Sequence, residues 1–231
     1  MVKKGAMNMT ILYEDNDIIV CIKPRGIVSQ EDGKNRENML SLLGGDVFPV
    51  HRLDRETEGI MVFAKNQKAA SAMSTLVQSH EQFRKQYLAV LEGIPEQPSG
   101  ELCDLLFHDV AKNKTYVVKK TRRGVKRAKL TYEVVAVADG DDGTPRTLVR
   151  VRLYTGRTHQ IRVQFASRHL PLAGDRKYGG SKDDSGLALY ACSLGFCHPV
   201  TGKELYFEAY PETKGAFALF ACLKAQEIPK K

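Results

Sequence analysis

No apolar run in the sequence is long enough to cross a bilayer, and the N-terminus lacks the apolar core and the cleavage pattern of a signal peptide. We therefore expect a soluble, cytoplasmic protein with no membrane partner. The five cysteines are odd in number and include no C-x-x-C pair, so we expect small buried thiols rather than a disulfide framework. Cys192, Cys197 and His198 resemble half of a metal site, but the partner half is missing.

The sequence also lacks a P-loop, a dinucleotide fingerprint and a complete set of metal ligands, so we expect neither a cofactor nor a metal. Internal repeats and low-complexity linkers are absent, and 42% hydrophobic residues are enough to bury a core. No change in composition forces a domain boundary. We predict a single domain over residues 10–225, a loose tail over residues 226–231, and a monomer.

Acidic residues are missing from one long segment. Between Lys112 and Lys129 the chain carries nine lysines or arginines and no Asp or Glu, within a protein of net charge +8. Such a segment attracts polyanions, although in an arbitrary protein a solvated basic loop is the ordinary interpretation. Nucleic acid becomes the stronger interpretation only if a site with matching chemistry lies nearby.

Short apolar runs bounded by turn residues predict a strand-rich fold. The expected strands cover residues 18–22, 60–64, 87–91, 128–137, 147–154, 188–190 and 204–210. Asn66 can cap a helix that runs to about His80, and residues 39–43 resemble a shorter helix. Because strands outnumber helices and cluster in hairpins, we predict an α+β fold with a mixed, largely antiparallel central sheet and flanking helices.

Residues 158–168 fit two structures. The alternation of Ile161, Val163 and Phe165 is typical of a strand, whereas Ile161 and Phe165 would also share one face of a helix. The preceding turn and the following Pro171 bound about three helical turns. We therefore predict a helix that Thr158 caps.

Three segments place charged or tyrosine side chains in or next to predicted secondary structure, where residues that only face solvent would be unusual. In the first, "HRLD", Asp54 stands between Arg52 and Arg55, just ahead of the apolar run 60–64. The second, "FRKQY", places Tyr87 early in an apolar strand, and the third, "LYTGRTHQIR", places Arg157 and Arg162 around a helix start. Taken singly, each is explained as well by an ion pair, a core tyrosine or a solvated arginine.

Taken together, the segments resemble the pseudouridine synthases of the large-subunit rRNA and tRNA class, whose signature is H-R-L-D-x-x-T-x-G. The signature here is "HRLDRETEG", and "IIVCIKPRG", "FRKQYLAVLEG", "LYTGRTHQIRV", "PLAGDRKYGG" and "LALYACSLGFCHPVTGKELYFEA" are similar to the other motifs of that family, in order. The resemblance covers about Ile11 to Pro211. It implies the pseudouridine synthase fold in a form without the additional S4 domain of many relatives.

The resemblance implies isomerisation of specific uridines in structured 23S rRNA or tRNA. By the family's motifs, Asp54 is the nucleophile, Arg162 is the cation that pairs with it, and Tyr87 stacks on the uracil and takes a proton from the sugar. Arg52 is suited to fill the space that the flipped base leaves and to hold a phosphate. Further RNA contacts are expected from Arg55, Arg157, Lys119, Lys120, Arg122 and Arg123.

The chain departs from the family pattern at two positions. Glu58 stands where the signature usually has Ser, and Gln164 stands where His usually follows "IRV". Two other interpretations stay open. The first is a non-catalytic RNA-binding or ribosome-assembly protein in which Asp54 is only a structural ion pair. The second is a glycosidase or nucleosidase, which would need a second acid that no motif supplies.

Overall fold

The computed structural model describes residues 9–31, 33–34, 36–79, 81–181 and 186–221. The predicted tail over residues 226–231 lies outside the described residues. The chain divides into two compact units, which we call unit 1 (Met1–Phe83 and Gly195–Phe207) and unit 2 (Arg84–Leu194 and Glu208–Lys231). No helix within the described ranges is long and apolar enough to span a membrane.

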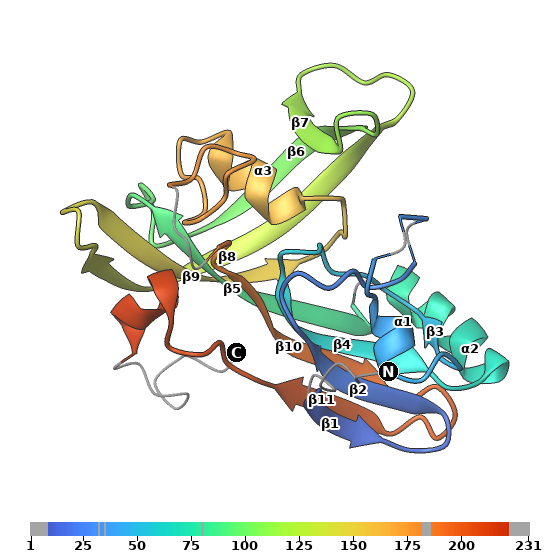
Figure 1. Ribbon diagram of the computed structural model, residues 1–231. Coiled ribbons are helices and arrows are strands. Elements are labelled where there is room, and N and C mark those ends of the chain that lie inside the picture. Colours follow the sequence, from blue (N-terminus) through green and yellow to red (C-terminus); the bar gives the residue numbers. More distant parts are fainter. Residues whose placement is uncertain (1–8, 32, 35, 80, 182–185, 222–231) are drawn as a thin grey trace. The chain divides into compact units, whose positions relative to one another are not determined.

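Unit 1 is built on antiparallel strands with two helices (Figure 1). Its elements are β1 (Ile11–Glu14), β2 (Ile18–Lys23), α1 (Met39–Leu42), β3 (Phe48–Pro49), β4 (Glu58–Ala64) and α2 (Gln67–Gln78). β2 lies between β1 and β4, and β3 pairs with the end of β4. Residues 60–64 of β4 are buried, as their continuous apolar run predicts.

The helix predicted after Asn66 is α2. The side chain of Asn66 accepts a hydrogen bond from the backbone N–H of Ala69 at 2.9 Å and so caps the helix as expected. The helix ends at Gln78, and the predicted end at His80 lies outside the described residues.

Unit 2 contains a second set of antiparallel strands in the order β5-β9-β8-β6-β7. Their bounds are β5 (Phe83–Glu92), β6 (Ser99–Asp109), β7 (Lys114–Val118), β8 (Val125–Asp139) and β9 (Pro145–Leu153). They are followed by α3 (Gln160–Ala166), β10 (Leu189–Cys197), β11 (Glu204–Glu208) and the short 3-10 helix η1 (Gly215–Phe220). β10 and β11 each begin in one unit and end in the other.

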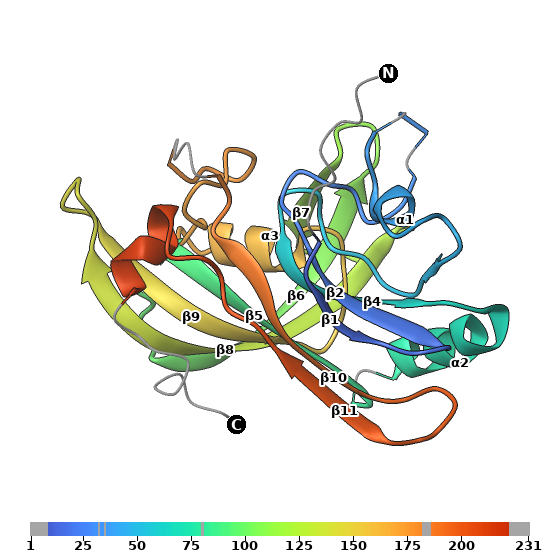
Figure 2. The ribbon, with the colours of Figure 1, turned by 60° about the horizontal axis from the view of Figure 1, so that its bottom comes forward.

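The two faces of the unit 2 sheet pack against different elements. Leu88 and Leu148 lie in one apolar cluster with Phe217 and Phe220 of η1, which lies against β8 and β9 (Figure 2). Leu106, Ala128 and α3's Val163 form another cluster on the opposite face. Because side chains alternate along a strand, this arrangement fixes which residues of β5, β8 and β9 point toward α3.

The predicted α+β class with a largely antiparallel sheet is confirmed, and two local expectations are corrected. The basic segment is not one solvated loop, because it forms β7, a turn and the start of β8. The helix in residues 158–168 exists but spans only Gln160–Ala166. Its N-cap is His159, in a left-handed conformation and without a side-chain cap, so Thr158 does not cap it.

Candidate active site

The backbone around Asp54 is held by a lysine that is fully buried. The ammonium of Lys23 donates hydrogen bonds to the carbonyls of Pro24 at 2.8 Å, Ile27 at 2.7 Å and Arg55 at 3.1 Å. Lys23 is the last residue of β2, so it ties the turn that follows this strand to the residue after Asp54. A buried ammonium needs such acceptors, because an unpaired buried charge would be very costly.

Further hydrogen bonds hold both neighbours of Asp54. The hydroxyl of Ser29 accepts from the backbone N–H of Leu53 at 3.0 Å and donates to its carbonyl at 2.9 Å. The backbone N–H of Gly26 donates to the Arg55 carbonyl at 2.9 Å. Asp54 is therefore a half-buried carboxylate on a short loop whose flanking residues are both fixed by the segment after β2.

The first and last residues of the signature have structural roles. Nε2 of His51 accepts a hydrogen bond from the backbone N–H of Val62 at 3.2 Å, which continues the β3–β4 pairing by one position. Gly59 lies at the start of β4 with φ 126°, where a residue with a side chain would be strained. These two residues connect the Asp54 loop to the buried strand β4.

The arginines on either side of Asp54 differ in their surroundings. The side chain of Arg52 is exposed. Arg55 is also exposed, and its guanidinium contacts the carboxylate of Glu56 at 2.6 Å. An exposed ion pair of this kind contributes little stability, so Arg55 can exchange Glu56 for another anion at small cost.

Lys23 should stabilise unit 1 more than an ordinary lysine does. Lys23→Met removes the donor to three carbonyls and leaves the buried Ile27 carbonyl without this partner, and we expect a loss of about 2 kcal/mol or more in unfolding free energy. Burial lowers the pKa of Lys23 to about 8, against the partial opposition of Glu56 and Asp54. The unfolded chain then binds more protons between pH 8 and 10.5, so the stability that Lys23 contributes rises with pH across this window.

Denaturant unfolding of Lys23→Met and the parent at neutral and alkaline pH tests this expectation. The stability difference between the two proteins should widen as pH rises from 8 toward 10.5. Lys68→Met, at an exposed position of α2, is the control and should match the parent at both values. Equal stability of the Lys23 variant and the parent would contradict the role of Lys23 as an anchor.

Tyr87 lies on β5 in unit 2, paired with Val151 of β9, and only 6% of its surface is exposed. By alternation its side chain is on the same face of the strand as Lys85 and Ala89 and opposite to Leu88. Leu88 packs in the cluster with η1, so Tyr87 points to the face that α3 covers farther along the sheet. A tyrosine that only packs in the core would be buried in the same way. The position of Tyr87 therefore fits both a core tyrosine and the catalytic tyrosine that the family motif implies.

Arg162 lies on α3 and is almost fully buried. Its Nε and Nη2 donate to the two carboxylate oxygens of Asp175, each at 2.7 Å, and its Cζ lies 5.2 Å from the centre of the Tyr178 ring. A bidentate pair stacked on an aromatic ring fixes the plane of a guanidinium. The ion pair between Arg162 and Asp54 that the family resemblance implies joins residues of different units and stays a prediction.

The turn before α3 is organised by Gln160. Its side-chain oxygen accepts from the Thr155 hydroxyl at 2.7 Å and from the backbone N–H of Arg157 at 3.1 Å. Its amide nitrogen donates to the Lys129 carbonyl at 3.1 Å. Nε of Arg157 donates to the Arg127 carbonyl at 3.0 Å, so this predicted RNA-binding residue also ties the turn to β8.

The unusual Gln164 has a defined partner. Its amide donates to the Asp104 carboxylate at 2.6 Å and to the Leu102 carbonyl at 3.2 Å, which joins α3 to β6. Arg168 adds a two-pronged contact to the same carboxylate, at 3.0 and 3.2 Å. The departure from the family pattern therefore serves to fix the helix that carries Arg162.

Sequence reasoning missed the residues that hold the candidate catalytic groups in place. Lys23 and Asp175 appear in the sequence analysis only within the motifs "IIVCIKPRG" and "PLAGDRKYGG", and Ser29 does not appear at all. Two patterns in the sequence could have pointed to these supporting residues. One is a lysine directly after a buried strand, and the other is an aspartate beside a glycine within a motif. Neither pattern says which backbone carbonyl or which arginine lies nearby in the fold.

A possible metal cluster in unit 1 is better explained as structure. Asp15, Asp17 and His198 bring ligand atoms within 4.8 Å of one another. However, Nδ1 of His198 accepts from two backbone N–H groups, and its Nε2 lies 2.9 Å from Asp15. Burial would raise the pKa of Asp15, but hydrogen bonds from Ile18, Tyr13 and Asp17 lower it to about 2. The cluster joins the β1–β2 turn to the turn after β10.

The signature loop around Asp54 and α3 with its buried Arg162 both lie within the segment that a family model matches. The chain belongs to the RNA pseudouridylate synthase family, whose model matches residues 17–167. It is accordingly an isomerase that converts uridine in RNA to pseudouridine.

Individual relatives agree with this assignment. The chain is 36% identical over 218 residues to the RNA pseudouridine synthase YlyB of Bacillus subtilis, covering 88% of this chain and 69% of the relative. It is 34% identical over 200 residues to the dual-specificity RNA pseudouridine synthase RluA of Vibrio parahaemolyticus, covering 82% and 78%. It is 31% identical over 225 residues to the ribosomal large subunit pseudouridine synthase D of Zymomonas mobilis, covering 87% and 68%.

A solved structure shares the fold. Human RNA pseudouridylate synthase domain containing 1 superposes with a TM-score of 0.74 over 92% of this chain and 87% of the human chain. The sequence identity of 21% means that this likeness concerns the fold alone.

Proposed function

We propose that the enzyme modifies specific uridines in structured ribosomal or transfer RNA, with Asp54 as the nucleophile. Two of the relatives carry names that refer to the large ribosomal subunit and to dual specificity. The observation that carries the proposal is the fixation of both neighbours of Asp54 by Lys23, Gly26 and Ser29. A carboxylate held on so constrained a loop loses little entropy when it attacks.

The reaction rearranges bonds within one nucleotide. The N1–C1′ bond breaks, the uracil rotates, and a C5–C1′ bond forms, while the proton leaves C5 and N1 regains one. Asp54 can attack C1′ to give a covalent adduct, or it can support elimination to a glycal after a proton leaves the sugar. In either route the carboxylate must be ionised, and a guanidinium nearby favours that form.

Arg162 and Arg52 are assigned different tasks. The bidentate contact with Asp175 supports Arg162 as a rigid cation that keeps the nucleophile charged and oriented. Arg52 is exposed beside Asp54, and its planar guanidinium can take the place of the flipped base in the RNA stack. Flipping costs a few kcal/mol, so this substitution matters most for structured RNA.

The basic segment is proposed to supply affinity without reading sequence. Lys119, Lys120, Arg122 and Arg123 are all exposed on the turn between β7 and β8. The guanidinium of Arg122 lies 4.4 Å from the centre of the Phe107 ring, which limits its freedom, whereas the two lysines are free to follow a phosphate backbone.

Replacing Lys119 and Lys120 with Gln should weaken binding to all RNAs alike. Each lost phosphate contact should reduce the slope of log affinity against log salt by about 0.7 to 0.9. Filter binding or fluorescence anisotropy over a salt series measures the slope. The matched control replaces Lys68 and Lys203, also exposed, and changes the net charge equally. A slope that falls equally in both variants would assign the effect to net charge rather than to this turn.

Site-resolved pseudouridine mapping of total RNA, from cells with and without the protein, tests the proposed function. We expect one or a few positions to lose pseudouridine and to regain it when the parent gene, but not an Asp54→Asn gene, is restored. A map that is unchanged by loss of the protein would favour the alternative of an RNA-binding or ribosome-assembly protein.

A further inference from the structure

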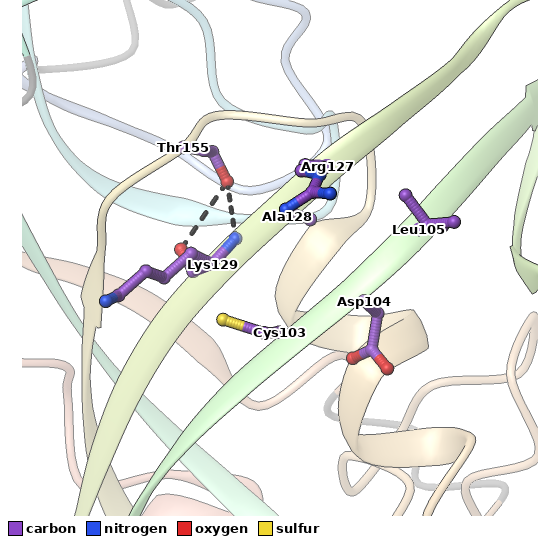
Figure 3. Close-up of a pocket in the computed structure, with 7 residues that line it drawn as sticks. All are labelled: Cys103, Asp104, Leu105, Arg127, Ala128, Lys129 and Thr155. Atoms are coloured by element: carbon purple, nitrogen blue, oxygen red, sulfur yellow. Dashed lines mark hydrogen bonds between the residues drawn. The ribbon is translucent and has the colours of Figure 1, made fainter. Parts of the chain in front are cut away.

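A pocket of about 320 Å³ in unit 2 is lined by residues of the paired strands β6 and β8 and by Thr155, which follows β9 (Figure 3). Its lining consists of Cys103, Asp104, Leu105, Arg127, Ala128, Lys129 and Thr155. Most of the wall is apolar, although the neighbouring segment is strongly basic. This volume is at the lower end of the range for small-ligand sites, so the pocket can hold a single small group.

The strand register divides the lining residues between two faces. Cys103 is paired with Lys129 and Leu105 with Arg127, and these four side chains share one face by alternation. The Asp104 carboxylate belongs to the other face, where it binds Gln164 and Arg168 of the α3 segment. The charged lining residues on this face are therefore the cations of Arg127 and Lys129, and Glu101 lies beside them on the same face.

An aromatic ring flanked by cations adjoins the pocket. Tyr154 lies opposite Lys129, with its backbone N–H donating to the Lys129 carbonyl at 3.1 Å. The Lys129 ammonium is 5.2 Å and the Arg152 guanidinium 5.0 Å from the centre of the Tyr154 ring. Lys129 also pairs with Glu101 at 2.8 Å, but both side chains are more than 40% exposed, so this pair is readily exchanged.

An apolar pocket, a half-exposed aromatic ring and three cations together favour an unstacked nucleotide over an apolar peptide. A peptide side chain would gain from the pocket but not from the cations, whereas a nucleotide offers a flat base and a phosphate. Bases within an A-form helix are stacked and cannot enter such a pocket, so the occupant must be single-stranded. Stacking on aromatic rings beside basic grooves is the usual way in which proteins hold single strands.

We propose that this pocket is a second RNA subsite that takes one unstacked nucleotide of the substrate, other than the target uridine. The base lies over the face of the β6–β8 pair that carries Cys103 and adjoins Tyr154, and the phosphate lies on Arg127 and Lys129. The subsite gives the enzyme a preference for an RNA that has a single-stranded nucleotide in addition to the target uridine. The proposal rests on the proposed function only in taking RNA as the ligand.

Cys103 provides a reporter within the pocket. Its thiol is exposed and donates a hydrogen bond to Glu101 at 3.2 Å, and this bond raises the pKa of the thiol. Alkylation at mildly alkaline pH will therefore be slow enough to follow by peptide mass spectrometry. Cys197, exposed in unit 1, is the internal control, whereas Cys21 and Cys192 are buried.

The experiment measures the iodoacetamide labelling rate of Cys103 in the parent enzyme with no RNA, with a short single-stranded RNA and with an RNA duplex of equal length. Each RNA is used at a concentration at which anisotropy shows saturation. We expect the single strand to slow labelling of Cys103 at least fivefold, and the duplex to leave it unchanged. Cys197 should label at one rate throughout.

A variant that fills the pocket gives an independent measurement. Cys103→Phe should weaken binding of the single-stranded RNA about tenfold, equivalent to about 1.4 kcal/mol, and leave duplex binding unchanged. Val137→Phe, at an exposed position farther along β8, is the control and should bind both RNAs as the parent does. Melting temperatures of both variants show whether each one is folded.

The outcomes separate this inference from the proposed function. Protection of Cys103 together with weaker binding by Cys103→Phe supports the subsite, and protection should persist in Asp54→Asn, which keeps the pocket but lacks the nucleophile. Unchanged labelling under saturating single-stranded RNA would overturn the subsite, even if the enzyme makes pseudouridine. Protection in an enzyme that makes no pseudouridine in any RNA would overturn the proposed function and leave the subsite standing.

Discussion

Asp54→Asn should abolish pseudouridine formation, with turnover reduced by more than about 10⁴-fold, as expected when an enzyme loses its nucleophile. The amide keeps the size and most of the hydrogen bonding of the carboxylate but cannot attack C1′. The loop itself should persist, because Lys23, Gly26 and Ser29 hold the backbone of the neighbouring residues rather than the Asp54 side chain. RNA affinity and melting temperature should therefore stay close to those of the parent.

Release of the C5 hydrogen isotope from labelled uridine in RNA measures the reaction, because C5 loses its hydrogen when it bonds to C1′. Glu56→Gln is a matched control, since it makes the same chemical change two residues away, in a carboxylate that pairs with the exposed Arg55. This control should retain most of the parent rate. Normal turnover by Asp54→Asn would exclude the carboxylate, whereas a large loss of melting temperature would favour a structural ion pair.

Local sequence patterns were sufficient for the elements that depend on local physics. The buried strands β2 and β4, the Asn66 cap and the hairpin of β8 and β9 follow from apolar periodicity and from side chains that bond to nearby backbone, whereas β6 was not predicted and β10 is longer than the predicted residues 188–190. The helix predicted within residues 158–168 is confirmed but is shorter at both ends, and its N-cap is His159 rather than Thr158. In the structure the Thr158 carbonyl accepts from Thr115, and Gln160 organises the turn through tertiary contacts.

The support of the candidate site could not be predicted, because it depends on contacts between distant segments. Lys23 meets Arg55 across 32 residues, and Arg162 meets Asp175 across 13. A lysine after a strand usually reaches solvent, and nothing local indicates that this one is buried with three carbonyls as acceptors. The resemblance to a family supplied the candidate catalytic residues, but the structure was needed to find what holds them.

The basic segment illustrates how tertiary structure changes the meaning of a composition. As a run of nine cations it predicts a flexible polyanion-binding loop. As part of β7 and β8 it presents some cations on a turn and others, such as Arg127 and Lys129, on a fixed strand face beside an apolar pocket. The proposed nucleotide subsite rests on the second arrangement.

Tyr87→Phe should separate RNA binding from chemistry, because the proposed stacking and proton transfer use different atoms of one side chain. Phe keeps the ring, so a stacking contribution of about 1–3 kcal/mol should survive and RNA affinity should stay near that of the parent. Loss of the hydroxyl should lower single-turnover rates by about 100-fold or more, the effect of removing a general base. Tyr87→Leu should lose both properties.

Tyr190→Phe makes the same change at a buried tyrosine of unit 2 that packs in the apolar cluster with Leu88 and Phe217. It should alter melting temperature slightly and turnover not at all. If Tyr87 were only a core tyrosine, with 6% of its surface exposed, the two Phe variants would behave alike. Melting temperature, RNA affinity and single-turnover rate measured on all three variants therefore decide the role, and a Tyr87→Phe enzyme with parental turnover would remove the hydroxyl from the mechanism.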